Sequence, residues 1–132
     1  MEILLIKTFP LNLYDWEKVG IIDRELEIFK SISKDKKIKF SIGTFGDNTE
    51  LKFQNKCNPI KIIPFFNSNY LKNSYLLKLL YSFFLPLIFI NKFKKFDIIQ
   101  SNQFWGSWIL ILCKLLLKKK TILRQGFDFY DF

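Results

Sequence analysis

The chain contains no histidine, and this absence excludes a zinc peptidase of the H-E-x-x-H type. Three other motifs are missing. The first strand is not followed by a G-x-G-x-x-G dinucleotide fingerprint, and the chain has neither a G-x-x-x-x-G-K-[ST] phosphate loop nor a G-x-S-x-G nucleophile elbow. The sequence therefore carries no signature of a zinc peptidase, a dinucleotide enzyme, a P-loop protein or a serine hydrolase.

Cysteine is scarce, with Cys57 and Cys113 far apart in the sequence. Cys113 falls in the apolar run Ile109–Leu117 and is expected to be a buried thiol, whereas Cys57 is expected in a polar loop. Two such residues predict neither a disulfide framework nor a metal cluster, so a reducing, cytoplasmic setting is the default. The amino-terminal MEILLIK is too short an apolar run for a signal peptide and lacks a basic leader.

Composition points to one globular domain over residues 1–132. The chain is 49% hydrophobic, which excludes the disordered class, and its length suffices for a real core. Its formal charge of +9 suits phosphates, anionic lipid or an acidic ligand, although many lysines can also simply keep an apolar chain soluble. A basic helix, zinc-finger spacing and an aromatic RNA-binding signature are all missing, so no nucleic-acid partner is expected.

Strand patterns alternate with helical patterns along the chain. Candidate strands lie near residues 2–7, 37–43, 60–64, 97–100 and 120–124, and helical patterns cover about 20–33, 75–90 and 104–117. Residues 8–19 are expected to form a loop. This alternation with short links predicts an α/β, Rossmann-like fold: a mainly parallel sheet with flanking helices.

The segment Tyr75–Ile90 is apolar nearly all round and allows three interpretations. It can be a helix packed on the sheet and kinked at Pro86. It can be a membrane-surface helix, since lysines at positions 72, 78, 92, 94 and 95 would meet anionic headgroups. A transmembrane span is the third, but Lys78 and Pro86 interrupt the run, which is shorter than the roughly 20 residues that a spanning helix needs.

Polar residues follow two of the predicted strands, within Asp97–Gly126. Asn102 and Gln103 come after the fourth strand, and Arg124 and Gly126 come after the fifth. Ligands of open parallel sheets bind outside the carboxyl ends of the strands, so these two tips predict a binding site.

Each candidate residue has a functional and a structural interpretation. Asn102 and Gln103 can hydrogen-bond ligand hydroxyls or cap the next helix. Trp105 can stack on a sugar ring, whereas Trp108 is expected in the core. Arg124 can bind a phosphate or a sugar acid, or form a surface salt bridge.

Gly20 and Arg24 are candidates at the start of the first helix. A glycine there lets a ligand approach the backbone amides, or it is only a hinge between loop and helix. Arg24 can meet an anion at the same place, or it is a structural residue of the helix surface.

Several short motifs occur together, and their order and spacing carry a resemblance. They are Trp16-x-x-x-Gly20, Arg24-Glu25-Leu26, Thr44-Phe45-Gly46, Ser101-Asn102-Gln103, Gly106-Ser107-Trp108 and Lys120–Gly126. In this arrangement the chain resembles the amino-terminal domain of glycosyltransferase family 4, a GT-B-fold family, over nearly its whole length.

The resemblance implies an acceptor-binding domain of a retaining, metal-independent glycosyltransferase. In such enzymes a second domain binds the nucleotide-sugar donor, and the acceptor is often a glycan or a lipid-linked sugar at the inner membrane face. The acceptor-binding residues would be Gly20, Arg24, Asn102, Gln103, Trp105, Arg124 and Gly126. Many members carry an amino-terminal histidine that this chain lacks, so its catalytic residues stay unassigned.

The chain ends at Phe132, where the resemblance predicts an incomplete acceptor-side domain without a donor domain and without turnover of its own. Two alternatives come from other classes of protein. One is a non-catalytic module that binds an anionic membrane surface from the cytoplasmic side. The other is a small nucleotide-binding regulator.

Overall fold

A single sheet of five parallel strands forms the centre of the molecule. The computed structural model describes residues 1–35, 37–67 and 74–124. Its strands are β1 (Glu2–Ile6), β2 (Lys39–Thr44), β3 (Lys61–Pro64), β4 (Ile98–Ser101) and β5 (Lys120–Leu123). They are ordered β3-β2-β1-β4-β5, and every neighbouring pair is parallel. The α/β, Rossmann-like fold predicted from the sequence is confirmed.

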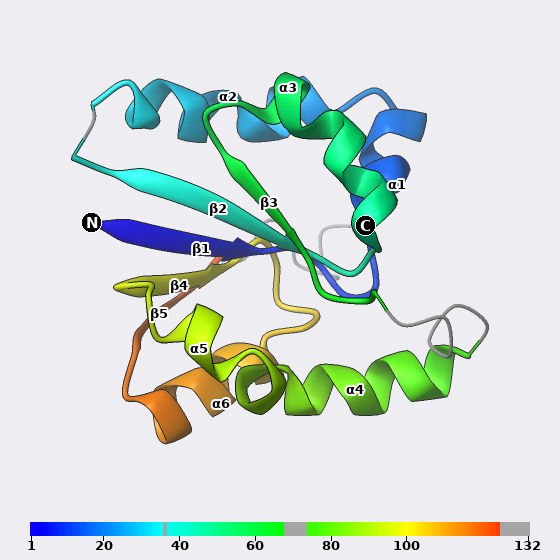
Figure 1. Ribbon diagram of the computed structural model, residues 1–132, viewed down its shortest axis with the longest axis vertical. Helices are drawn as coiled ribbons and strands as arrows, with labels where there is room; N and C mark the ends of the chain where they lie inside the picture. The colour runs from blue at the N-terminus through cyan, green and yellow to red at the C-terminus, as the bar shows by residue number, and fades with distance from the viewer. Residues whose placement is uncertain (36, 68–73, 125–132) are drawn as a thin grey trace, which may run out of the picture.

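Helices cover both faces of the sheet (Figure 1). One face carries α1 (Leu13–Lys18), α2 (Ile22–Ser33), the 3-10 helix η1 (Asn48–Phe53) and α3 (Gln54–Cys57). The other carries α4 (Tyr75–Ile88), α5 (Ile90–Phe93) and α6 (Trp108–Leu117). The chain runs outward from β1 to β3 and then returns to β4 and β5. Because crossovers between parallel strands are right-handed, this reversal moves the helices to the opposite face.

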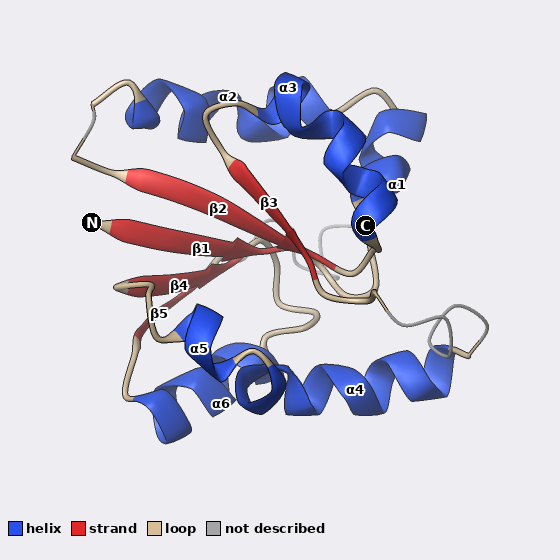
Figure 2. Ribbon diagram, viewed as in Figure 1, coloured by secondary structure: helices blue, strands red, loops and turns tan. Residues whose placement is uncertain are grey.

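The hydrophobic core has two layers, one on each side of the sheet. Figure 2 shows the strands between the two groups of helices that cover these layers. Alternate residues of β1 divide between them, since Ile3 and Leu5 pack towards α2 whereas Leu4 and Ile6 pack towards α4 and α6. Residues 3–6 are all buried, as expected for the middle strand of a parallel sheet.

Two segments predicted as loops contain helices. The segment 8–19 includes α1, whose first turn is closed by a capping box: Asn12 accepts from the Asp15 amide, and Asp15 accepts from the Asn12 amide. The segment after β2 forms η1 and α3, and Cys57 is a buried thiol of α3 rather than a loop residue. All three helices are too short for hydrophobic periodicity to reveal them.

Helix α4 has an inverted distribution of polar and apolar side chains. Its serine, Ser82, is buried and accepts a hydrogen bond of 3.0 Å from the indole of Trp108. Pro86 is buried within the helix, which ends at Ile88. Its outer side exposes a long apolar row: Leu76, Leu80, Phe83, Phe84 and Leu87. The helix does pack on the sheet, but with most of its apolar surface turned outward.

The open edge of β3 is closed by a side chain. Gln54 of α3 donates to the carbonyl of Ile60 (2.8 Å) and accepts from the amide of Ile62 (3.0 Å). These are the backbone groups that another strand would use. Pro64, at the end of the same strand, has no N–H to offer. The edge is therefore protected against pairing with a further strand.

A substitution at Gly43 of β2 tests the close packing between the sheet and the segment after β3. A Cβ at this position would overlap the ring of Phe65, which is itself buried. We expect Gly43→Ala to lower the free energy of unfolding by about 1–3 kcal/mol, because the ring has no free space to move into. Urea unfolding followed by circular dichroism measures this. The neighbouring Ser41→Ala serves as the control, and equal stability of the two variants would contradict the packing described.

Candidate functional site at the carboxyl edge of the sheet

The carboxyl ends of β1 and β4 form the switch point of the sheet, where the order of strands reverses. The segment after β4 folds over the end of β1. The Asn102 amide donates to the carbonyl of Ile6 (2.8 Å), and the Phe9 amide donates to the carbonyl of Trp105 (3.2 Å). Two backbone contacts thus fix this segment against the loop that follows β1.

The structure brings three predicted site residues together in that segment. Asn102 and Gln103 are half-buried, and Trp105 is 51% exposed. Helix α6 starts at Trp108 with Ser107 as its N-cap and has no side-chain cap, so the interpretation of Asn102 and Gln103 as capping residues is wrong. Neither amide side chain hydrogen-bonds another residue in the described part of the chain, and both can receive a ligand.

Arg124 lies one strand further along the same edge. It directly follows β5, whose last residue, Leu123, is in register with Ser101 of β4. Its side chain is exposed and forms no ion pair with any residue that the structure describes, so the predicted surface salt bridge is not formed there. Gly126 lies outside the described residues.

Gly20 and Arg24 lie on a different surface. Together with residues up to Lys34 they line a shallow hollow on the outer side of α2. Gly20 has a φ of +72°, which suits the tight turn between α1 and α2. The Arg24 guanidinium pairs with the adjacent Glu25 at 3.1 Å. These two residues do not share a hollow with Asn102, Gln103 or Trp105.

A separate hollow of about 300 Å³ lies past the ends of β2 and β3. It is lined by Asn12, Tyr14, Phe45, Gly46, Asp47, Thr49, Phe66 and Lys78. The ring of Phe9 connects it to the segment after β4, since that ring contacts Phe45 at 5.1 Å while the Phe9 amide bonds Trp105. In the sequence, only the motif Thr44-Phe45-Gly46 pointed to residues of this lining.

Two buried charged residues beneath this hollow were not recognised in the sequence. Lys7, just after β1, is 1% exposed; its ammonium donates to the carbonyl of Asn12 (2.6 Å) and lies 3.6 Å from the centre of the Trp16 ring. Glu50 of η1 is 0% exposed and accepts hydrogen bonds from the Leu13 amide and the Thr44 hydroxyl. The two side chains do not form a direct ion pair, so each is satisfied mainly by its own partners.

Burial shifts the protonation of both groups towards the neutral form. Loss of water around Lys7 lowers its pKa from 10.5 to about 7, and the nearby Glu50 only partly offsets this. Burial raises the pKa of Glu50, against the two hydrogen bonds that favour its carboxylate. Lys7 can therefore change charge near neutral pH, although its position beneath Trp16 makes it a support of the site rather than a group that meets a ligand.

Two glycines in the motifs that carry the resemblance have packing roles. A Cβ at Gly46 would overlap the carboxylate of Glu50. At Gly106 it would lie 3.2 Å from Phe9, and its φ of +99° is a conformation that other residues rarely adopt. These glycines allow the loops after β2 and β4 to close over the end of β1.

Metal and thiol chemistry find no support in the described residues. They contain no group of three or more histidine, cysteine or acidic side chains placed to hold a metal ion. Both cysteines are buried, and burial raises the pKa of Cys113 to about 12 and that of Cys57 above its ordinary value, which makes them poor nucleophiles.

Comparisons with known proteins give no further guide. No family model, no curated protein and no solved structure matches the chain. Its function therefore has to be inferred from the chemistry of its own surfaces.

The pKa of Lys7 predicts a specific pH dependence of stability. The unfolded chain keeps a proton on this lysine up to about pH 10.5, whereas the folded state releases it near pH 7. Stability should therefore rise with pH within this window, because the unfolded state binds more protons there. Between pH 7.5 and 9 we expect the wild type to gain about 2 kcal/mol relative to Lys7→Met.

Urea unfolding at several pH values measures the difference between the two profiles. The exposed Lys18→Met is the matched control, and its profile should parallel that of the wild type. Parallel profiles for wild type and Lys7→Met would show that Lys7 keeps its ordinary pKa in the folded protein.

Proposed function

We propose that the chain is the acceptor-binding domain of a retaining glycosyltransferase of the family 4 type, which transfers a sugar from a nucleotide-sugar donor to a glycan or glycolipid. The observation that carries the proposal is the grouping of Asn102, Gln103 and Trp105 at the switch point of the sheet. The grouping lies where parallel sheets bind ligands, and the resemblance in sequence supports its assignment to the acceptor.

The chemistry of these three side chains suits a sugar. Each amide offers both donors and acceptors, which match the hydroxyl groups of a pyranose, and neither is engaged by a described neighbour. The half-exposed indole of Trp105 presents an apolar face beside them, to which the C–H side of a sugar ring can pack. Arg124, one strand away, adds a fixed cation for a phosphate or an acidic sugar.

The proposal assigns binding rather than turnover to these residues. An amide does not titrate usefully, so neither Asn102 nor Gln103 can act as a general base. Donor binding and transfer belong, by the resemblance, to a second domain, and the nucleotide sugar is a substrate of the whole enzyme. We expect no sugar transfer by the 132 residues alone.

Glycan binding by the chain tests this proposal. We expect the wild type to bind a subset of glycans on an array of immobilised bacterial and eukaryotic glycans, and Asn102→Ala and Trp105→Ala each to weaken this binding about tenfold. One lost hydrogen bond or one lost stacking surface accounts for that change.

Phe104→Ala is the matched control, since Phe104 is an exposed neighbour of Trp105 that the proposal does not place against the sugar. Binding that survives both site substitutions, or an array without any signal, would count against an acceptor site at this edge.

A second candidate function, binding to an anionic membrane surface, is favoured by the outer surface of α4 and α6. The apolar row of α4 continues onto α6, where Ile111, Leu115 and Leu116 are exposed. Exposed lysines lie at the end of this layer, at Lys92, Lys94 and Lys95. Apolar side chains that enter the interface beside lysines that meet headgroups are typical of peripheral membrane proteins.

Among the helices of the described residues, none has the length and apolar character that crossing a membrane requires. Peripheral attachment at the inner membrane face is compatible with the first candidate, because a lipid-linked acceptor is itself held at that surface. The two candidates can therefore be true together, but they make separate predictions.

Sedimentation with vesicles tests the membrane candidate. We expect the chain to co-sediment with vesicles that contain anionic phosphatidylserine and to bind neutral phosphatidylcholine vesicles less. The double variant Leu76→Ser/Phe84→Ser should lose most of this binding, because each side chain buries apolar surface in the interface.

Val19→Ser/Ile28→Ser is the matched control, since both residues are exposed apolar side chains on the layer of α1 and α2. Equal loss in the two double variants would mean that α4 does not define the membrane-facing side.

A further inference from the structure

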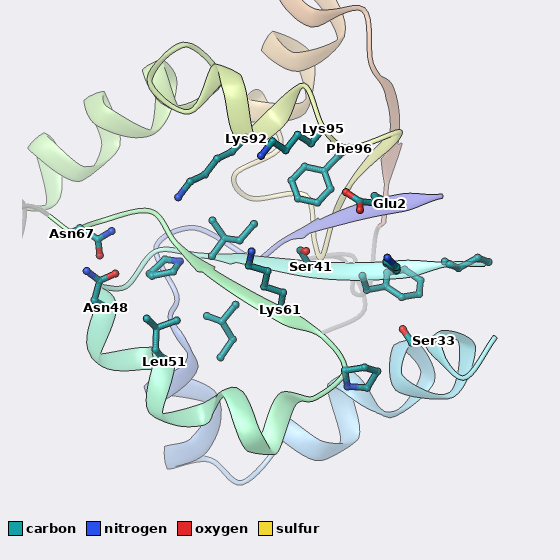
Figure 3. A pocket seen from close by; sticks show the side chains of 17 residues that line it. Glu2, Ser33, Ser41, Asn48, Leu51, Lys61, Asn67, Lys92, Lys95 and Phe96 are labelled. Atoms are coloured by element: carbon teal, nitrogen blue, oxygen red, sulfur yellow. The ribbon is translucent and has the colours of Figure 1, made fainter. Parts of the chain in front are cut away.

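A basic groove of about 1040 Å³ lies along β3 (Figure 3). Four lysines line it: Lys39, Lys61, Lys92 and Lys95. Figure 3 shows Lys92 and Lys95 reaching from α5 and the residues after it, while Lys61 projects from β3 itself. Neutral polar side chains of Ser41, Asn48 and Asn67 lie among them. None of the predicted site residues belongs to its lining.

The alternation of the strands explains why lysine and serine side chains enter this groove beside apolar ones. Ile63 packs into the core layer of α4 and α6, and Lys61, two residues earlier on β3, therefore points to the same face of the sheet. Ser41 of β2 is in register with Lys61 and lies beside it. At this corner the sequence places Lys61 and Ser41 on a face that is apolar elsewhere, and apolar residues such as Ile63 and Phe96 line the groove beside them.

The groove has an excess of unpaired positive charge. None of the four lysines forms an ion pair with any residue that the structure describes. Among the described lining residues the single carboxylate is that of Glu2. Like charges around one groove repel one another, and an anionic ligand would relieve this repulsion.

The groove also excludes two kinds of anionic partner. An acidic peptide that adds a strand to β3 would need the backbone groups that Gln54 already occupies. A single-stranded nucleic acid needs exposed aromatic rings on which its bases stack, but Phe40 and Phe96, which line the groove, are both buried. A ligand that carries negative charges and hydroxyl groups matches the lysines and the neutral polar side chains of this lining.

We propose that this groove binds an acidic glycan, a sugar chain that carries carboxylate or phosphate groups. The volume accommodates several sugar units rather than a single anion, and the serine and asparagine side chains suit hydroxyl groups between the charges. The choice of a glycan rests on the proposed function, for which the groove would hold a growing acidic polysaccharide at a distance from the reacting end.

Fluorescence anisotropy with a labelled oligogalacturonate of about six units tests the inference on the full chain. We expect saturable binding that weakens about tenfold in the quadruple variant Lys39→Gln/Lys61→Gln/Lys92→Gln/Lys95→Gln. The matched control, Lys18→Gln/Lys34→Gln/Lys114→Gln/Lys120→Gln, removes the same charge from exposed lysines elsewhere and should bind almost as the wild type. Circular dichroism confirms that both variants are folded.

Equal weakening in the two quadruple variants would overturn the inference, because binding would then depend on net charge alone. Stronger binding of inorganic polyphosphate or of a thymidine oligonucleotide than of the oligogalacturonate would also overturn the assignment to a glycan. If binding of the oligogalacturonate is lost in Trp105→Ala but kept in the quadruple groove variant, the carboxyl-edge proposal stands and the groove inference fails. If binding is kept in Trp105→Ala but lost in the quadruple groove variant, the groove inference stands and the carboxyl-edge proposal fails.

Discussion

The buried carboxylate of Glu50 holds together the loops on which the carboxyl edge depends. It accepts from the Leu13 amide at the start of α1 and from the Thr44 hydroxyl at the end of β2, beneath a glycine that leaves room for it. A buried carboxylate is costly unless its oxygens are bonded, and these two contacts provide that compensation. The segments after β1 and β2 are thereby fixed to each other, and the ammonium of Lys7 is enclosed between them under Trp16.

This rigid base gives the two outer surfaces their separate characters. At the carboxyl edge, backbone contacts tie the segment after β4 to the end of β1, while the amides of Asn102 and Gln103 stay unengaged by the described residues. On the layer of α4 and α6, apolar side chains face outward and the one serine of α4 faces inward. Under the proposed function, a lipid-linked acceptor would place its sugar at the polar edge and its lipid against the apolar, lysine-bordered layer.

The fold could be predicted from the sequence because long, regular signals carry it. Each predicted strand is present within about two residues, since apolar runs such as Ile3–Ile6 mark a parallel sheet. The burial of Lys7 and Glu50 could not be predicted. Charged residues are mostly exposed in proteins, and a single sequence does not show the neighbours that would bury them. Gly20 and Arg24 were grouped with the other site residues because the sequence places them near the start of a helix. The packing of α2, which the sequence does not show, places them at a different hollow.

The three tryptophans allow the central claim, that the carboxyl edge beside Trp105 is the ligand site, to be tested directly. Trp16 is buried over Lys7, Trp108 donates to Ser82, and Trp105 is exposed at the switch point, so their indole N–H signals should be resolved in a ¹⁵N NMR spectrum. Titration with a glycan that the chain binds on the array should move the Trp105 signal and leave that of Trp16 in place. A titration in which the Trp105 signal stays fixed while the glycan binds would contradict the account.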